Sequence, residues 1–219
     1  KAVDVPFADA GSQSLWIEIL TEFIQRFRHI EIQNRRKHPA ICQTHTEVSV
    51  RGYLDLQDKR FTTHEAHSSI PFVGFVDRVD MDASGRAVVI DYKRTDETKH
   101  QAATWVNKHE LQLALYAQAL LAGLSSLPIR EIVGAQYYSI MPLRRQKGMF
   151  LHDADALYEL PKKTLTTVDR DQIFSLVMEK AVEAVLAIQS GRYQPEPTDA
   201  NECERCNWAN LCRAPHLNH

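Results

Sequence analysis

The spacing of apolar side chains predicts long helices near both ends of the chain. Apolar residues recur at helical intervals over residues 14–37, and Pro39 follows as a stop signal. Residues 171–189 repeat this period, with an Asp near the start and Gly191 just beyond the end, where helix termini favour them. A third amphipathic helix is predicted over residues 108–122.

Shorter runs of β-branched and apolar residues predict the strands of a sheet. The strands are expected over residues 46–56, 72–81, 87–93 and 131–141. The second and third of them are joined by Asp-Ala-Ser-Gly at 82–85, which is tight-turn chemistry and predicts an antiparallel hairpin. Residues 57–69 are polar and predict a loop or an irregular hairpin, and the basic run after Pro142 predicts a loop.

Length and composition favour one soluble domain with small appendages. The chain has 219 residues, of which 44% are hydrophobic and 25% are charged. We divide it into an N-terminal helical segment (1–43), a core (44–192) and a cysteine-containing tail (193–219). No stretch approaches the roughly 18 to 20 apolar residues of a membrane span, and no secretory signal is evident. We therefore expect no membrane contact and a cytoplasmic location, and the non-Met residue Lys1 suggests a piece of a longer protein.

The formal net charge of −2 excludes the uniformly basic character of many nucleic-acid-binding modules. Any nucleic acid must then contact local basic groups. Three basic clusters are candidates for phosphate contacts, although solvated surface charge is the alternative for each. The clusters are Arg35, Arg36 and Lys37; Arg144, Arg145 and Lys147; and Lys93 with Arg94.

Two aspartates and a lysine form the strongest candidate site. Asp91 and Lys93 are two residues apart on a predicted strand, so their side chains point to the same face. The hairpin turn places Asp77 near Asp91. Two carboxylates on neighbouring strands suit a hard cation such as Mg²⁺ or Mn²⁺, which activates water and stabilises charge on a phosphate. Lys93 would orient or deprotonate that water, or neutralise the scissile phosphate; a plain surface ion pair is the alternative for a lone D-x-K.

Three motifs in order resemble those of one nuclease family. GFVDRVD (74–80), VVIDYK (88–93) and QLALYAQAL (112–120) are similar to successive motifs of the RecB-like branch of the PD-(D/E)XK nucleases. The resemblance covers roughly residues 44–213. It implies an α/β, restriction-endonuclease-like core, in which a mixed central sheet is flanked by helices, and it makes residues 44–192 the nuclease core.

The same resemblance assigns roles to individual residues. It implies that Asp77 and Asp91 bind metal and that Lys93 is the catalytic lysine. It also implies that Gln112 and Tyr116, which are four residues apart on one helical face, support the site or touch DNA.

The metal ligands beyond the two aspartates are left open. Glu47 stands where the family often has an acidic residue on the first core strand, so it is either a further ligand or a solvent-facing glutamate. Many RecB-like nucleases also carry a metal-binding histidine in a G-x-x-x-H pattern, which this sequence lacks. His29 is the only histidine of the first predicted helix.

A cysteine pattern lies in the tail. Cys203, Cys206 and Cys212 form C-x₂-C-x₅-C, and in a cytoplasmic chain such spacing favours metal binding over disulfides. The pattern resembles the C-terminal cysteines of AddB-type nucleases, which implies a [4Fe-4S] cluster completed by one upstream cysteine. Cys42 is the only other cysteine, and a free thiol or a ligand upstream of Lys1 is the alternative.

A zinc site with His216 as the fourth ligand is the weaker alternative for the tail.

These features together predict a metal-dependent DNA exonuclease. We expect it to be the nuclease part of a DNA repair or recombination protein of the helicase–nuclease type, with DNA and a helicase domain or subunit as partners. The alternative is a DNA-end-binding or structural module with weak or no catalysis. A purely structural metal-cluster domain that docks a partner protein is a third interpretation, but it leaves the D…D-x-K arrangement unexplained.

Overall fold

The computed structural model describes residues 10–94, 101–160 and 163–193, with 195, 197, 201, 203, 206–208 and 212. Its helices are α1 (Ala10–Lys37), α2 (Gln112–Leu121) and α3 (Thr167–Gln189), with short 3₁₀ turns at Ala102–Thr104 and Ala154–Ala156. Its strands are β1 (Gln43–Asp55), β2 (Arg60–Thr62), β3 (Ser69–Met81), β4 (Arg86–Lys93), β5 (Glu131–Ser139) and β6 (Arg144–Phe150).

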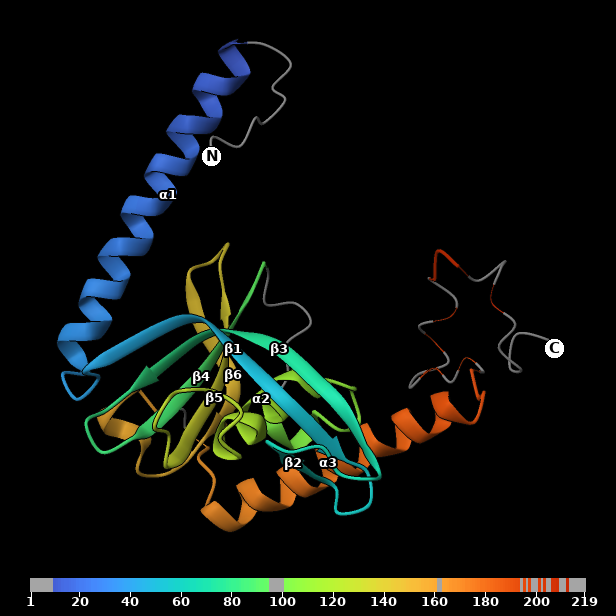
Figure 1. Cartoon of the computed structure of the whole chain (residues 1–219). Helices are drawn as coiled ribbons and strands as arrows, with labels where there is room; N and C mark the ends of the chain where they lie inside the picture. The colour runs from blue at the N-terminus through green and yellow to red at the C-terminus, as the bar shows by residue number, and fades with distance from the viewer. Residues whose placement is uncertain are drawn as a thin grey trace.

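The strands form one mixed sheet in the order β2-β1-β3-β4-β5-β6 (Figure 1). Neighbouring strands are antiparallel except β4 and β5, which are parallel. A parallel pair needs a crossover connection, and α2 lies in the segment that joins β4 to β5. The predicted α/β fold with a mixed sheet flanked by helices is confirmed.

Each face of the sheet carries its own core. On one face, α2 and α3 cover a large cluster that includes Val50, Val89, Leu113 and Val177. On the other face, the end of α1 and residues 154–160 cover a smaller cluster that includes Val88 and Ile90. Successive residues of β4 thus enter different cores, as the twofold alternation of a strand requires.

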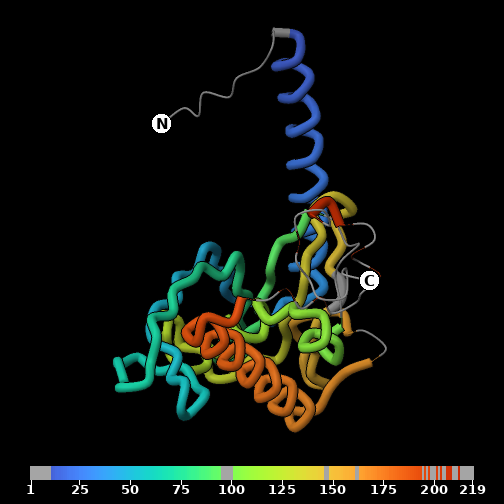
Figure 2. The backbone as a smooth tube through the Cα atoms, turned by 90° about the vertical axis from the view of Figure 1, so that its right-hand side faces the viewer, coloured from blue at the N-terminus to red at the C-terminus, as the bar shows by residue number. Residues whose placement is uncertain are grey.

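Only the C-terminal half of α1 packs on the body of the protein. Figures 1 and 2 show this helix projecting away from the sheet. Phe27 is the first aromatic contact with the sheet, with its ring centroid 5.8 Å from that of Tyr138. Apart from the half-buried Phe23, the large apolar residues before it on the described part of α1 are exposed: Leu15, Trp16, Ile17, Ile19, Leu20 and Ile24. No helix among the described residues combines the length and apolar character needed to cross a bilayer.

A buried ion-pair network holds α1 against the sheet. Arg78 of β3 donates two hydrogen bonds of 2.8 Å to Asp80 and one of 2.6 Å to Glu31 of α1. Arg145 of β6 donates to both carboxylate oxygens of Glu31 at 2.9 Å. The Tyr158 hydroxyl donates to Asp80. Two guanidinium groups and two carboxylates balance in charge, which buried charges require.

The network lowers the pKa of both carboxylates. Burial raises the pKa of Asp80, but the hydrogen bonds and charge of Arg78 outweigh burial and hold it below its usual value. Burial likewise raises the pKa of Glu31, and Arg145 and Arg78 together bring it below the usual range. A carboxylate whose pKa is lower in the folded than in the unfolded chain stabilises the fold at pH values above its pKa in the unfolded chain. That stabilisation is lost as pH falls through the folded value.

The structure corrects the loop predicted after Pro142. Those residues turn at Leu143, with φ 51°, and then form β6 antiparallel to β5. The basic run concealed the strand, because Arg145 is buried beneath α1 with a partner 114 residues away in the sequence.

The structure also moves the start of the third predicted helix. That helix, α2, begins at Gln112 rather than near Lys108. His109 has a φ of 54°, which an α-helix cannot include, and the Glu110 amide donates back to the Trp105 carbonyl at 2.9 Å. The short strand β2 lies within the segment predicted as a loop or irregular hairpin.

We predict that the free energy of unfolding falls as pH is lowered from about 5 toward 2, because Asp80 and Glu31 must become protonated. Glu31→Gln should weaken this dependence. It should also reduce stability at pH 7 by about 3 kcal/mol, because Arg78 and Arg145 would remain buried without that charge. Urea titrations at several pH values measure both effects. Glu18→Gln, on the exposed half of α1, is the matched control, and equal effects of the two variants would contradict the prediction.

Candidate active site

The β3–β4 ladder ends at the candidate site. The backbone pairing runs from Met81↔Ala87 to Arg78↔Ile90, and the next step would place Asp77 opposite Asp91. There the Tyr92 amide donates to the Asp77 carboxylate at 2.8 Å instead of to a backbone carbonyl. The Asp77 side chain thus takes the place of a backbone acceptor, and the backbone pairing of β3 with β4 stops at this carboxylate. The predicted hairpin and the predicted proximity of the two aspartates agree with this geometry.

Lys93 joins Asp91 to the start of α2. Its Nζ lies 2.6 Å from Asp91 Oδ2 and donates to Gln112 Oε1 at 3.1 Å. The Asp91 side chain is only 4% exposed, whereas that of Lys93 is 31% exposed. The buried Asp91 carboxylate and the partly exposed Lys93 ammonium therefore both lie on the α2 side of the sheet, as the strand alternation predicts.

Tyr137 of β5 forms the floor beside this pair. Lys93 Nζ lies 5.9 Å from the centroid of its ring, within the range of a cation–π contact. Burial raises the pKa of Tyr137, and the negative charges of Glu110 and Asp91 raise it further. The hydroxyl is therefore protonated at neutral pH. Glu110 is an acidic neighbour of the site that the sequence analysis did not identify, because it lies in the turn before α2.

Tyr116 packs against Gly74 of the first motif. A Cβ atom added at Gly74 would lie 2.7 Å from Tyr116 Cε1 and 3.1 Å from its hydroxyl, closer than van der Waals contact allows. The glycine thus makes room for the tyrosine, three residues before Asp77. Four of the predicted residues, Asp91, Lys93, Gln112 and Tyr116, come from β4 and α2, and β3 brings Asp77 to them.

Glu47 and His29 are placed differently. Glu47 is exposed, has a left-handed φ of 51°, and lies opposite Asp77 in the β1–β3 register. Left-handed backbone is uncommon for a residue other than glycine. Here β1 changes face: Thr44 bonds to Asp80 on the α1 side, while Val50 is buried on the α2 side. His29 is exposed on α1 and pairs with Gln33 at 2.8 Å.

The donor set suits a cation held by few protein ligands. Among the described residues, no group of three or more His, Cys, Asp or Glu side chains is gathered as a metal site. Asp77 and Asp91 still provide two carboxylates at the open end of one hairpin. Mg²⁺ is commonly bound by one or two carboxylates, several waters and substrate phosphates, so the residues present fit that ion.

The comparison with protein families decides the affiliation. The model described as "PD-(D/E)XK nuclease superfamily" matches residues 2–213. The chain belongs to the PD-(D/E)XK nuclease superfamily. The comparison with curated proteins finds no match. Among solved structures, the crystal structure of SSO0001 is similar at 17% identity and a TM-score of 0.36, over 90% of this chain and 70% of that chain.

The GFVDRVD motif contributes residues to two different parts of the structure. Asp77 faces the candidate site, whereas Arg78 and Asp80 belong to the buried network under α1. The sequence analysis missed the second role, and the alternation of Asp77 with Arg78 was the only available signal. Tyr92 contacts both, since its amide donates to Asp77 and its hydroxyl accepts from Arg78 at 3.3 Å.

The structure also revises the candidate phosphate contacts. Arg145 is buried in its ion pair with Glu31, with a side chain 13% exposed, so it is removed from the predicted DNA-binding surface. Arg35 donates to Thr44 and to the Ile41 carbonyl. The exposed basic residues of the three predicted clusters, among those whose side chains the structure describes, are Arg35, Arg36, Lys37, Arg94 and Arg144.

Among the described residues, Cys203, Cys206 and Cys212 of the tail are not joined by disulfide bonds. The Cys206 amide donates to the Cys203 carbonyl at 3.2 Å, and the Trp208 amide donates to Cys206 Sγ at 3.4 Å. Cys42 is exposed at the loop that joins α1 to β1. Figure 1 shows that loop on the side of the molecule away from the C-terminal end of α3. His216 lies outside the described residues.

We predict that Gly74→Ala is destabilising because its methyl group meets the Tyr116 ring. The same substitution should be tolerated in a Tyr116→Ser background, where the ring is absent. Thermal unfolding of the two single variants and the double variant gives the coupling free energy, which should be about 1 kcal/mol or more. Additive effects at Gly74 and Tyr116 would contradict the contact.

Proposed function

We propose that this chain is a divalent-metal-dependent deoxyribonuclease that acts from DNA ends, with Asp77, Asp91 and Lys93 at its centre. One observation carries the proposal: the β3–β4 ladder ends where the Asp77 carboxylate takes the Tyr92 amide, beside the Lys93–Asp91 ion pair. Family membership supports nuclease chemistry. The action on ends, and the role in a repair or recombination protein with a helicase domain or subunit, rest on the RecB-like motifs.

Each residue of the site has a distinct task in this proposal. Asp77 and Asp91 would hold Mg²⁺ or Mn²⁺, which when bound lowers the pKa of a water molecule and offsets charge on the phosphate. Lys93 would move from Asp91 toward the scissile phosphate or the attacking water, since its side chain is 31% exposed. Gln112 would limit that movement through its hydrogen bond to Lys93. Tyr116 would keep α2 against β3 at the motif glycine.

The phosphodiester chemistry places few demands on the protein beyond positioning. The water oxygen bonds to phosphorus in line with the leaving oxygen, the phosphorus–oxygen ester bond breaks, and the water proton passes to solvent or to the leaving oxygen. A fixed positive charge near the non-bridging oxygens lowers the barrier because negative charge grows there. Lys93 can provide that charge, since a side chain anchored on a strand is better oriented than one on a loop.

A second candidate function is DNA-end binding with little cleavage. It is favoured by the absence, among the described residues, of a third metal-binding side chain beside Asp77 and Asp91. It is also favoured by the position of His29, which pairs with Gln33 on an exposed helix face. The Lys93–Asp91 ion pair speaks for cleavage, because binding of ends alone needs no carboxylate at the phosphate.

The first test is cleavage of linear and circular DNA in Mg²⁺ or Mn²⁺. We predict that linear DNA is degraded and closed circles are spared. Lys93→Ala should lower the rate by about 100-fold or more while leaving the fold intact.

Asp77→Asn and Asp91→Asn should each weaken Mn²⁺ binding in calorimetry, since each removes a charge from an oxygen-ligand site.

Matched controls for this test lie on the exposed surface. Lys59→Ala and Asp58→Asn remove the same charges from exposed residues, and both should retain full activity. Wild-type cleavage by Lys93→Ala would reject its catalytic role. Metal-independent DNA-end binding without cleavage would favour the second candidate function.

We also propose that Cys203, Cys206 and Cys212 hold an inorganic centre, with [4Fe-4S] favoured over zinc. Two observations support this proposal. The first is the C-x₂-C-x₅-C spacing, and the second is the hydrogen bond that the Trp208 amide donates to Cys206 Sγ, because such a contact stabilises negative charge on sulfur. The fourth ligand is Cys42 or a group outside this chain; His216 would be the fourth ligand of a zinc site. Such a centre would order a tail that buries little apolar surface.

We predict that anaerobically purified protein is brown and contains iron and sulfide in near-stoichiometric amounts. Cys206→Ser should lose both and lower the melting temperature, because binding free energy at the centre becomes folding free energy for the tail. Cys42→Ser tests the fourth ligand separately and should have the same effect only if Cys42 is that ligand. Colourless anaerobic protein without iron or zinc would reject the proposal for this chain.

A further inference from the structure

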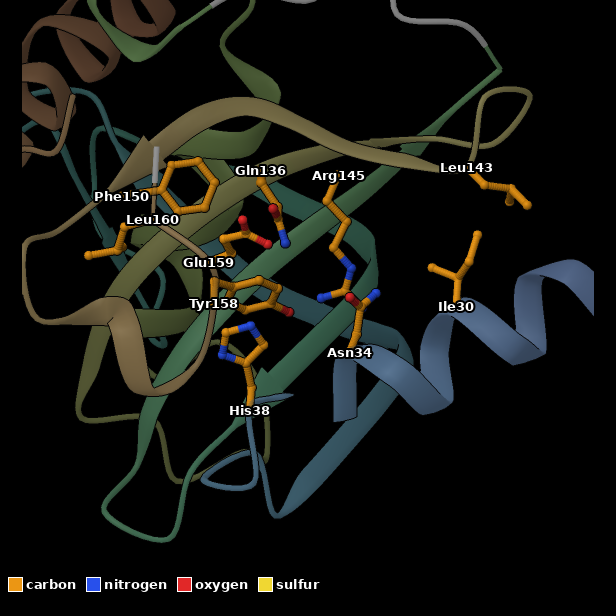
Figure 3. A pocket seen from close by; sticks show the side chains of 10 residues that line it. All are labelled: Ile30, Asn34, His38, Gln136, Leu143, Arg145, Phe150, Tyr158, Glu159 and Leu160. Carbon is orange, nitrogen blue, oxygen red and sulfur yellow. The ribbon is translucent and has the colours of Figure 1, made fainter. Parts of the chain in front are cut away.

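A cavity lies on the face of the sheet opposite the candidate active site. It has a volume of about 430 Å³ and is lined by residues of the C-terminal half of α1, of strands β5 and β6, and of the segment 158–160. Volumes of this size hold small-molecule ligands. Figure 3 shows polar groups of Gln136, Arg145 and Asn34 directed into it, with Phe150, Leu160 and Ile30 at its sides.

Two buried donors in this cavity lack acceptors. Gln136 is only 1% exposed, and its Nε2 has no hydrogen-bond partner in the part of the chain that the structure describes. Arg145 Nε is likewise buried without a partner there, although the other end of its guanidinium is paired with Glu31. Buried donors in native proteins are nearly always satisfied. Because both unsatisfied atoms are donors on the lining of one cavity, the missing group is an acceptor.

The charges around the cavity select a neutral acceptor. Glu31 already neutralises Arg145, and the exposed carboxylate of Glu159 at the rim pairs with Lys37, 3.9 Å away. Burial, with a smaller contribution from the Arg145 charge, holds the pKa of His38 below its ordinary value, so that ring is neutral at pH 7. Arg145 and Lys37 are thus each already paired with a carboxylate, so an anion in the cavity would have to compete with Glu31 or Glu159 for its cation. A carbonyl oxygen or ring nitrogen avoids that competition.

Planar side chains form part of the cavity wall. The Tyr158 ring stacks with His38 at a centroid distance of 6.1 Å and carries the Arg145 guanidinium 5.0 Å from its centroid. Phe150 and Leu160 provide apolar surface near the Gln136 amide (Figure 3). A side-chain amide beside aromatic and guanidinium planes is a common way to recognise the edge and the faces of a base.

We propose that this cavity binds one nucleobase through its ring carbonyl or ring nitrogen, with Gln136 Nε2 as the central donor. The choice of nucleobases over other flat carbonyl compounds rests on the proposed function, in which DNA is the substrate. The base belongs either to a free nucleoside or to a DNA strand that passes behind the sheet. The site is separate from Asp77, Asp91 and Lys93, which face α2 on the other side of the sheet.

The test measures binding rather than cleavage, so it is independent of nuclease activity. The full chain in EDTA is titrated calorimetrically with thymidine, with deoxyguanosine and with a five-residue thymidine oligonucleotide. Deoxyribose 5-phosphate, which lacks a base, is the negative probe. We expect saturable binding of at least one base-containing probe and none of the sugar phosphate. Binding of both thymidine probes identifies a free-nucleoside site, and binding of the oligonucleotide alone identifies a strand site.

Three variants locate the binding. Gln136→Met removes the donor at similar volume and should weaken binding about tenfold, the effect of one lost hydrogen bond. Leu160→Trp should abolish binding by filling the cavity without altering the amide, and it provides the test should Gln136→Met fail to fold. Gln33→Met on the exposed side of α1 is the matched control and should bind as the wild type does. Absence of saturable binding for every base-containing probe, or full binding by Leu160→Trp, would overturn the proposal.

Discussion

A guanidinium group buried in the middle of a sheet must have carboxylates within hydrogen-bond reach, and Arg78 imposes this requirement on the whole molecule. Its side chain is 8% exposed, and burial alone would lower its pKa, but the hydrogen bonds and charge of Asp80 raise it. Asp80 lies on the same strand, so the remaining donor must find a partner elsewhere. Glu31 is that partner, which explains why the second half of α1 lies across this face.

The same requirement places the segment after β6. Asp80 is completely buried and accepts from Tyr158, which brings residues 154–160 over the sheet. Arg145 then fits between Glu31 and the rings of Tyr138 and Tyr158. The elements that line the cavity are therefore positioned by the charge of Arg78, which is buried on β3. Apolar packing alone would not select these positions, because many apolar arrangements have similar free energies.

Strand alternation explains which parts of the site could be predicted. Asp91 and Lys93 share a face because they are two residues apart, and the turn at 82–85 is encoded locally, so the hairpin followed from the sequence. Gln112 and Tyr116 were recognised as one helical face for the same reason. Glu110 was missed because the turn that carries it depends on a left-handed residue, His109, and on a backbone contact with Trp105.

The network could not be predicted because its partners are distant in sequence. Glu31 and Arg78 are 47 residues apart, and Glu31 and Arg145 are 114 apart. Judged from its sequence neighbours alone, each of these charged residues is expected on the surface. The basic run of β6 therefore predicts a loop. A charged residue in a strand is compatible with burial only when a partner approaches from another element, and pairing at that range is invisible to periodicity.

The buried polar groups on this face differ in one respect that bears on function. The carboxylates of Asp80 and Glu31 accept from several donors, so their part of the network is closed within the chain and serves to position elements. The Gln136 amide lies on the same face, yet its donor has no acceptor among the described residues. Replacement of such a group by an apolar one of equal size would cost little or nothing in stability. A fold that pairs its charges across 114 residues while leaving the Gln136 Nε2 and Arg145 Nε donors without acceptors among the described residues gives these donors a role outside the stability of the core. Both donors belong to residues that line the cavity, so a bound ligand can supply the missing acceptor there.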